Sequence, residues 1–383
     1  SVRQDADRLP QKIHPDNPRA QRILADAMRA RAACFWATEC GRGCAIKANY
    51  QSPTVHLPPA FATGNLDIVT DAMVREVLVD DEGRATGVSY IDKTTGEERT
   101  VHARAVVLAA SSAESIRILF NSKSPRFPDG LANSSGRLGR YIMDTVGSGL
   151  GGRLPLLENL PPLNEDGAGG PHLYIPWWLY GAQKAGKLDF PRGYHLEFGT
   201  GHSMPSVHSG WGAAGLYGRR FKEDLRRHYG ASVYFGSRGE MIPNEDCYCE
   251  LDPAVKDKFG LPVLRFHWKW SDYELKQVMH MQHAVAELIE AIGGKPSPIN
   301  PNPLSILRPG GNVKHEVGGA MMGADPKRSV TNPWCRTWDV KNLYLCDGAP
   351  FCSNADKNPT LTIMALAWRT ADHVLEEMQR GNV

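Results

Sequence analysis

An uninterrupted apolar run at residues 105–110 constrains the fold of this chain more than any other feature. The run carries no polar side chain, and such runs are typical of strands that are buried on both faces of a parallel sheet. It passes through Ser111 and Ser112 into a helical pattern at residues 113–121, where a serine is well suited to cap the first turn. The sequence therefore predicts a fully buried strand that leads directly into a helix.

Alternating and periodic patterns predict the other regular elements. Expected strands lie at residues 66–70, 72–79 and 85–91. Expected helices lie at residues 17–33, 272–292 and 360–378. Residues 247–270 are expected to form two strands around turns at Asp252-Pro253 and at Lys258-Phe259-Gly260. Residues 150–235, with their glycines, prolines and tryptophans, are expected to form sheet and loops.

The composition is that of an ordinary globular protein. Of 383 residues, 42% are hydrophobic and 22% are charged, and a net charge of +2 gives no electrostatic case for nucleic-acid binding. Mean hydropathy is −0.37, and no apolar stretch approaches the length of about 18 residues that a membrane span needs. The chain begins at Ser1 without an initiator methionine or a visible signal peptide. We therefore expect a processed or truncated chain, or one piece of a larger polypeptide.

The cysteines and histidines do not predict a metal site. Among eight cysteines, Cys34, Cys40 and Cys44 come closest to a cluster. Their spacing differs from the Cys-x2-Cys pairs of zinc sites, so buried thiols or one local disulfide are the favoured interpretation. His280 and His283 are three positions apart on an expected helix, but without an evident third ligand they are expected to have core or surface roles.

One glycine-rich segment imitates a nucleotide-binding loop. Residues 147–152, Gly-Ser-Gly-Leu-Gly-Gly, match the pattern G-x-G-x-x-G. In a dinucleotide-binding loop this pattern opens a helix, because the cofactor phosphates bind at the helix N-terminus. Here Pro155, Pro161 and Pro162 follow, and they do not permit such a helix. We expect a strand or turn at 147–152 instead.

A histidine and an asparagine near the C-terminus have the chemistry of a site that oxidises an alcohol. Such a site needs a base for the hydroxyl proton, and a pKa near working pH favours histidine. His315 precedes Gly318 and Gly319, which permit a close approach of the backbone to a cofactor. Asn358 precedes Pro359 at the start of an expected helix, whose N-terminus favours negative charge. The same residues also fit a structural histidine and a helix cap.

Several short motifs occur in a fixed order along the chain. They are Gly83-Arg84-Ala85-Thr86-Gly87, Ala109-Ala110-Ser111-Ser112, His315-Glu316-Val317-Gly318-Gly319, Met322-Gly323, Asp347-Gly348-Ala349 and Asn358-Pro359-Thr360-Leu361-Thr362. This order resembles the glucose–methanol–choline (GMC) family of flavin oxidoreductases. The resemblance begins at about Cys34 and is weakest across 150–235. Bacterial members that oxidise sugars and polyols are the most similar.

The resemblance implies roles for individual residues. It implies His315 as the catalytic base and Asn358 as its partner at the substrate hydroxyl. It also implies flavin adenine dinucleotide (FAD) as the cofactor, bound by Val74, Ala110, Ser111, Asp347, Gly348, Pro359 and Thr360. In the family, the residue that matches Val74 meets the adenine through its backbone. The pair that matches Asp347 and Gly348 approaches the ribityl-diphosphate.

Part of the family's cofactor site has no counterpart in this sequence. In the family, the first strand, its G-x-G-x-x-G loop and the acid that binds the ribose all precede the matching region. We therefore expect a missing N-terminal segment or a second polypeptide to supply them. The electron acceptor is not indicated by any motif.

The expected fold class is α/β, with two domains. A Rossmann-like FAD-binding domain, incomplete in this chain, is expected at 1–140 and 300–383. A substrate domain with an antiparallel sheet and helices is expected at 141–299. There Trp177, Trp178 and His195 are expected to contact substrate, and the alternative is that the tryptophans pack the sheet.

The resemblance thus implies an FAD-dependent dehydrogenase or oxidase. Its substrate is expected to be a small molecule with an alcohol group, on a sugar, glycoside or polyol. The hydride of the alcohol carbon is expected to pass to flavin N5. The alternative is a non-catalytic remnant of the family that serves as a binding or assembly subunit, since the nucleotide-binding loop is missing. The sequence leaves the cellular location open and favours the bacterial cytoplasm over the periplasm.

Overall fold

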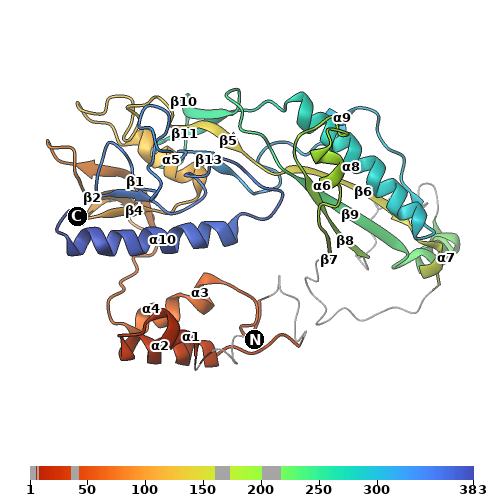
Figure 1. Cartoon of the computed structure of the whole chain (residues 1–383), viewed down its shortest axis with the longest axis horizontal. Helices are drawn as coiled ribbons and strands as arrows, with labels where there is room; N and C mark the ends of the chain where they lie inside the picture. The colour runs from red at the N-terminus through yellow and green to blue at the C-terminus, as the bar shows by residue number, and fades with distance from the viewer. Residues whose placement is uncertain (1–5, 7, 36–42, 160–172, 201–216) are drawn as a thin grey trace. The chain divides into compact units, whose positions relative to one another are not determined.

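A computed structural model describes residues 6, 8–35, 43–159, 173–200 and 217–383 (Figure 1). The chain forms two compact units. The first unit comprises Ser1–Thr70, Pro155–Leu173 and Gly199–Ser232. The second unit comprises Asp71–Leu154, Tyr174–Phe198 and Val233–Val383. The boundaries of these units differ from the domain boundaries expected near residues 140 and 300. The expected division into two domains stays a prediction.

The described part of the first unit is helical. Its helices are α1 (Leu9–Ile13), α2 (Pro18–Arg29), α3 (Ser52–Val55), α4 (Leu57–Ala62), the 3-10 turn η2 (Pro155–Leu157) and α7 (Gly218–His228). Helix α2 begins where the Asn17 side chain accepts a hydrogen bond from the Ala20 amide at 3.0 Å, and Ala25 and Met28 are buried. The helix predicted at 17–33 is confirmed, with an earlier end at Arg29.

The strand predicted at residues 66–70 is wrong. Residues 65–70 have no regular secondary structure, and Ile68 and Val69 are 47% and 60% exposed. The local alternation suited a strand, but a strand is stable only when a neighbouring strand takes up its hydrogen bonds.

The second unit begins with an antiparallel sheet, β1-β2-β3, whose strands are β1 (Ala72–Val79), β2 (Ala85–Asp92) and β3 (Glu98–His102). The turn after β1 is closed by a 2.7 Å hydrogen bond from the Arg84 amide to the Asp80 carboxylate, with Gly83 at φ 81°. The predictions for 72–79 and 85–91 are therefore confirmed.

The apolar run at 105–110 forms strand β4 (Val106–Leu108), which pairs in parallel with β14 (Leu343–Leu345). Val106 and Leu108 are buried, but Val107 is 48% exposed. The prediction of a fully buried strand is therefore wrong, because the face of this parallel pair that carries Val107 is open. In a parallel sheet both faces are ordinarily covered.

The helix predicted after this strand is confirmed as α5 (Ser112–Asn121). The predicted serine cap is wrong. Ser111 has φ 80° and makes no capping hydrogen bond with its side chain. The Ser112 hydroxyl instead donates to the Gly318 carbonyl at 2.8 Å. Ser112 therefore connects the start of α5 to a distant segment, and the Ser111 side chain does not cap the helix.

An antiparallel sheet of order β11-β10-β5-β13 packs beside α5. Its strands are β5 (Arg140–Met143), β10 (Tyr248–Lys256), β11 (Pro262–His267) and β13 (Val317–Gly319). The turn predicted at Asp252-Pro253 is wrong, since β10 continues through it with a register shift between Leu251 and Lys256. A proline is tolerated at such an irregularity. The chain turns at residues 257–261 instead, which includes the other predicted turn.

The remaining sheet has the order β12-β6-β9-β8-β7 and carries a long helix on β6. Its strands are β6 (Val146–Arg153), β7 (Leu173–Ile175), β8 (Tyr194–Thr200), β9 (Ser232–Gly239) and β12 (Lys295–Pro296); the helices nearby in sequence are α6 (Tyr180–Lys184), α8 (Asp272–Ala291) and α9 (Pro303–Ile306). Helix α8 confirms the prediction for 272–292 and buries Val278, Met281 and Val285 completely. The antiparallel sheet and helices expected for the substrate domain are confirmed.

The glycines at 147–152 lie within β6, as the strand interpretation predicted. A Cβ atom on Gly149 would stand 1.9 Å from the Tyr234 hydroxyl, so a side chain at that position has no room. On the same strand, the Ser148 hydroxyl accepts a 2.6 Å hydrogen bond from Gln282 of α8. These residues therefore serve the packing of the sheet.

The chain ends in helix α10 (Thr360–Gln379), close to the predicted 360–378. Thr370 and Glu377 are buried, whereas Leu361, Trp368 and Leu375 are 74%, 57% and 58% exposed. The three exposed side chains are seven positions apart and form one stripe along the helix. No helix among the described residues combines the length and the apolarity that a membrane crossing requires.

Candidate active site

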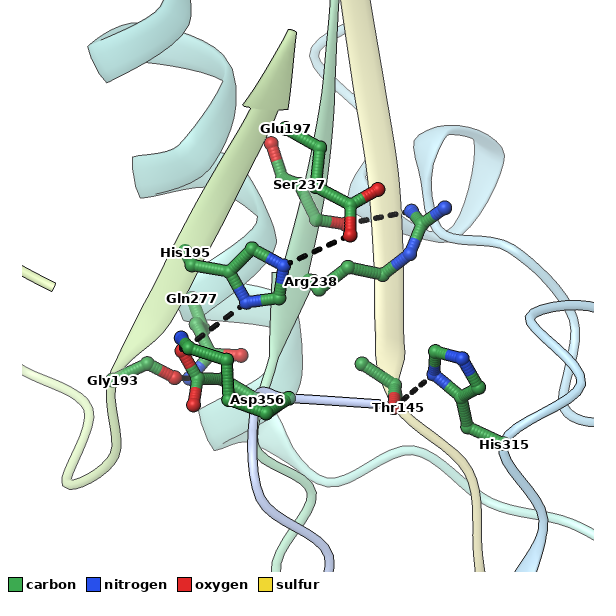
Figure 2. A network of polar contacts seen from close by, with 10 residues as sticks. Thr145, Gly193, His195, Glu197, Ser237, Arg238, Gln277, His315 and Asp356 are labelled. Atoms are coloured by element: carbon green, nitrogen blue, oxygen red, sulfur yellow. Dashed lines mark hydrogen bonds and ion pairs between the residues drawn. The ribbon is translucent and has the colours of Figure 1, made fainter. Parts of the chain in front are cut away.

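His315 lies between α9 and β13 with its side chain half-buried. Its Nδ1 atom is 3.0 Å from the Thr145 hydroxyl oxygen (Figure 2). Burial and, after it, the positive charge of Arg238 lower the pKa of His315 below its ordinary value. The imidazole is therefore neutral at neutral pH and can accept a proton.

The charge of Arg238 provides a test of this electrostatic arrangement. Replacing Arg238 with Met removes a positive charge near His315, so the pKa of His315 should rise toward its ordinary value. The ring protons of His315, followed by NMR across a pH titration, report this pKa directly. Arg153→Met on β6 serves as the control and should leave the titration unchanged. An unchanged His315 pKa in the Arg238 variant would contradict the arrangement.

Asp144 holds the backbone that carries His315. It lies between β5 and β6, and its side chain is completely buried. Its two carboxylate oxygens accept hydrogen bonds from the amides of Thr145 at 2.7 Å, Gly311 at 2.9 Å, Val313 at 3.2 Å and His315 at 3.1 Å. Burial raises the pKa of Asp144, although these four bonds oppose the change. The carboxylate thus fixes the loop at 311–315 and also the residue that faces the imidazole.

Gly318 and Gly319 are required by protein packing. Their φ values are 85° and 88°, a region that favours glycine. A Cβ atom on Gly318 would stand 2.2 Å from the Tyr141 carbonyl oxygen, and one on Gly319 would stand 2.2 Å from Ile116. These glycines therefore permit a close approach of the backbone to strand β5 and helix α5. Their close approach to a cofactor stays a prediction.

The loop that leads to Asn358 is attached to His315. The Asn354 side chain donates to the His315 carbonyl at 3.3 Å, and the Asn354 backbone forms a bridge with Met241. Asn354 is buried and Asn358, four positions later, is exposed. The structure thus brings the loop before Asn358 onto His315. The pairing of the His315 and Asn358 side chains stays a prediction.

Four of the residues expected to bind cofactor gather at the carboxyl ends of the parallel strands. Ala110 and Ser111 follow β4, and Asp347 and Gly348 follow β14. The Ser115 hydroxyl accepts from the Ala110 amide at 3.1 Å and donates to Asp347 Oδ2 at 2.5 Å. Burial raises the pKa of Asp347 above its ordinary value. Ligands of α/β proteins bind at this end of the sheet.

The other three cofactor residues lie at two places. Val74 lines a cavity of about 390 Å³ that Ala110 also lines, together with Arg75, Lys93 and Glu114. Pro359 is buried and directly precedes α10, and Thr360 is the first residue of that helix. The first amides of a helix have no partner within it. They are therefore free to face an acceptor.

The residues expected to contact substrate differ in exposure. Trp177 is buried, its ring centroid lies 4.8 Å from that of Tyr194, and its indole N–H donates to the Gln183 side chain at 3.0 Å. It packs the domain, as the alternative interpretation proposed. Trp178 is 43% exposed. The His195 side chain is completely buried, and this burial argues against the predicted direct contact with substrate.

The part of the chain that the structure describes contains no group of three His, Cys, Asp or Glu side chains that could hold a metal ion. Cys40 lies outside the described residues. Cys34 is exposed, and Cys44 is a free thiol. His280 Nδ1 lies 2.8 Å from the Tyr194 hydroxyl, and His283 is exposed.

Sequence reasoning missed Asp144, Thr145, Glu197 and Arg238. Asp144 and Thr145 directly follow the short strand pattern at 140–143, and a buried acid at a strand end could have been noted. Glu197 and Arg238 lie on separate strands of one sheet, and no local pattern connects them to His315.

Two sequence models described as GMC oxidoreductase match the chain, one over residues 20–142 and the other over residues 243–367. The 2-methyl-1,2-propanediol dehydrogenase of Mycolicibacterium austroafricanum is 32% identical, over 84% of this chain and 57% of the relative. The fructose dehydrogenase large subunit of Gluconobacter japonicus is 27% identical, over 92% of this chain and 61% of the relative. The chain thus spans about three fifths of the length of these relatives.

A solved structure of formate oxidase is similar in fold. The superposition has a TM-score of 0.60 at 15% sequence identity, and it covers 82% of this chain and 62% of the oxidase chain. These matches confirm the family resemblance that the motifs indicated. The two sequence models cover regions near both ends of the chain.

Proposed function

Because the chain belongs to the GMC oxidoreductase family and has its fold, we propose that it takes part in the FAD-dependent oxidation of an alcohol group on a sugar, glycoside or polyol. One observation carries this proposal. His315 presents a neutral imidazole whose Nδ1 faces the Thr145 hydroxyl, on a loop that the Asp144 carboxylate holds. This is the arrangement that a base for an alcohol proton needs.

The residues present fit three parts of FAD. Val74 and Ala110 line one cavity, which suits the adenine end. Asp347 and Gly348, at the carboxyl ends of the parallel strands, suit the ribityl-diphosphate, and Pro359 with Thr360 places the helix N-terminus of α10 for the flavin ring. When bound, FAD supplies the acceptor for the hydride of the alcohol carbon.

His315 handles the proton of the substrate hydroxyl. With a hydrogen on Nδ1 that is donated to Thr145, the imidazole keeps the lone pair on Nε2 for the substrate. The proton passes to Nε2 as the carbon gives up its hydride, and the product is a carbonyl compound. Asn358 is proposed to orient the hydroxyl through its side-chain amide. Asp144 excludes alternative positions of the loop and thereby keeps His315 at one place.

The substrate class is proposed from polar groups near His315 and from the relatives. Arg238 and Glu197 both act electrostatically on His315, and both offer hydrogen bonds to hydroxyl groups. The two relatives are named for a diol and for a sugar. We therefore propose a small polyhydroxylated substrate.

We further propose that another segment or polypeptide covers the open side of this chain. Val107 on β4 and the α10 stripe of Leu361, Trp368 and Leu375 are apolar and exposed. Exposed apolar patches mark surfaces that bind a partner. A unit that supplies the glycine-rich loop would pair beside β4, because that loop belongs to the same parallel sheet in the family. One relative is itself named as the large subunit of its enzyme.

Intact mass and N-terminal sequencing of the native protein test this second proposal. A native chain longer than 383 residues at its N-terminus, or a stoichiometric second chain with a G-x-G-x-x-G motif, supports it. A native protein that consists of these residues alone and still binds FAD would contradict it.

The alternative function is a non-catalytic binding or assembly subunit, which the exposed apolar side chains of Val107 and of the α10 stripe favour. The absorption spectrum of the native protein, with all its chains, distinguishes the two functions. A flavin band is expected for the enzyme. A colourless preparation that does not take up added FAD would favour the subunit.

A further inference from the structure

His195 on β8 joins two distant parts of the site (Figure 2). Its Nε2 atom is 3.2 Å from Glu197 Oε1, two positions along the same strand. Its Nδ1 atom is 3.2 Å from Asp356 Oδ2, which lies in the loop before Asn358. The His195 side chain has no exposed surface, and the side chains of Glu197 and Asp356 are 14% and 15% exposed. The imidazole is therefore enclosed between two largely buried acids.

We call this pair of contacts the bridge. Each ring nitrogen of His195 has one carboxylate oxygen within hydrogen-bond distance, one from its own strand and one from the loop before Asn358. Buried polar groups are stable when they are hydrogen-bonded in this way.

The other groups around the bridge favour the charged form of Asp356. Burial opposes ionisation of Asp356, but hydrogen bonds from His195 and Lys357 together outweigh it and keep the pKa of Asp356 below its ordinary value. Lys357 contacts the same carboxylate oxygen. Tyr174 packs on the His195 ring, with centroids 5.2 Å apart.

The bridge acts on the segment that ends at Asn358. That loop is attached at Asn354 to the His315 carbonyl, and at Asp356 to His195. Asn358 is two positions beyond the second attachment, so the Asp356 contact limits where Asn358 can lie relative to His315. We propose that His195 is a positioning residue, whose contacts with Glu197 and Asp356 clamp the Asn358 loop to strand β8. Its catalytic consequence rests on the proposed function, but the clamp itself does not.

His280 is the matched control for the clamp, because it lies in the same domain and its Nδ1 has one neutral partner, the Tyr194 hydroxyl.

The clamp is tested by hydrogen exchange on the native holoprotein. His195→Gln should raise amide exchange across 352–358, whereas His280→Gln should leave that loop protected. Asp356→Asn, a milder change at the other end of the bridge, should raise exchange in the same loop. Amide exchange in the double variant should be no faster than in either single variant, since both substitutions remove the same contact between His195 and Asp356. Unchanged protection in both single variants would overturn the proposal.

The catalytic consequence is read separately. Misplacement of a reacting group by about 1 Å can cost about 100-fold in rate, so we expect kcat in His195→Gln to fall by about that factor while KM changes much less. A different result is that the variants lose exchange protection while the wild-type protein shows no activity. That result would support the clamp and contradict the proposed function. Wild-type kcat in His195→Gln would overturn the positioning role.

Discussion

His315→Ala is expected to lower kcat for alcohol oxidation by a factor of about 10²–10⁴. The imidazole is the proposed acceptor of the hydroxyl proton, and an alanine side chain provides none. Stability should change little, because the imidazole is half-buried and the hydrogen bond that it loses, to Thr145, joins two side chains. Stopped-flow reduction of the bound flavin by substrate measures the effect without dependence on the electron acceptor.

Two further variants make this prediction specific. Asn358→Ala should lower the same rate by orders of magnitude, since its amide is the proposed partner of the hydroxyl. His283→Ala, an exposed histidine on α8, is the control and should react like the wild type. Unchanged flavin reduction in both the His315 and Asn358 variants would refute the assignment of these residues.

Asp144→Asn is expected to have the second largest effect, on stability and on turnover together. Each oxygen of this buried carboxylate accepts two backbone N–H groups. An asparagine replaces one oxygen with an NH₂ group, which leaves two buried N–H donors without an acceptor, at about 1–3 kcal/mol each. Chemical denaturation measures the loss in the free energy of unfolding. Because the loop at 311–315 is released, kcat should fall as well.

A matched variant separates this effect from a general loss of aspartate. Asp80→Asn removes a carboxylate that accepts a 2.7 Å bond from the Arg84 amide in a surface turn. The loss of a surface contact of this kind is expected to lower the free energy of unfolding by less than about 1 kcal/mol. An Asp144→Asn protein as stable and as active as the Asp80 variant would show that Asp144 does not hold the base.

Sequence patterns predicted those helices and strands whose stabilising contacts are close together in the sequence. The strands at 72–79 and 85–91 are joined by a turn whose residues supply their own hydrogen bonds, and α8 has an amphipathic pattern with an acidic first turn. The apolar run also predicted the strand after residue 105. It did not predict the exposure of Val107, because that exposure depends on what packs against the sheet and not on the run itself.

The candidate site was predicted only in part. His315, Asp347 and Asn358 came from motifs, and the structure places the first two beside Thr145 and Ser115. The groups that hold them act across long sequence separations. Asp144 binds a loop near residue 311, and His195 binds Asp356, and neither contact leaves a local pattern in the sequence. Likewise, the positive φ values of Gly318 and Gly319 were foreseeable, but their neighbours Tyr141 and Ile116 were not.

The most direct test of the central claim is anaerobic mixing of the native protein, with all its chains, and small polyols or sugars. The claim is that this chain supplies the base of an FAD-dependent alcohol oxidation. The account predicts that the visible flavin band bleaches on addition of a substrate in the wild-type protein. In His315→Ala the band should be present at equal intensity but bleach at least about 100-fold more slowly. A wild-type protein without a flavin band, or a His315→Ala protein that bleaches at the wild-type rate, would contradict it.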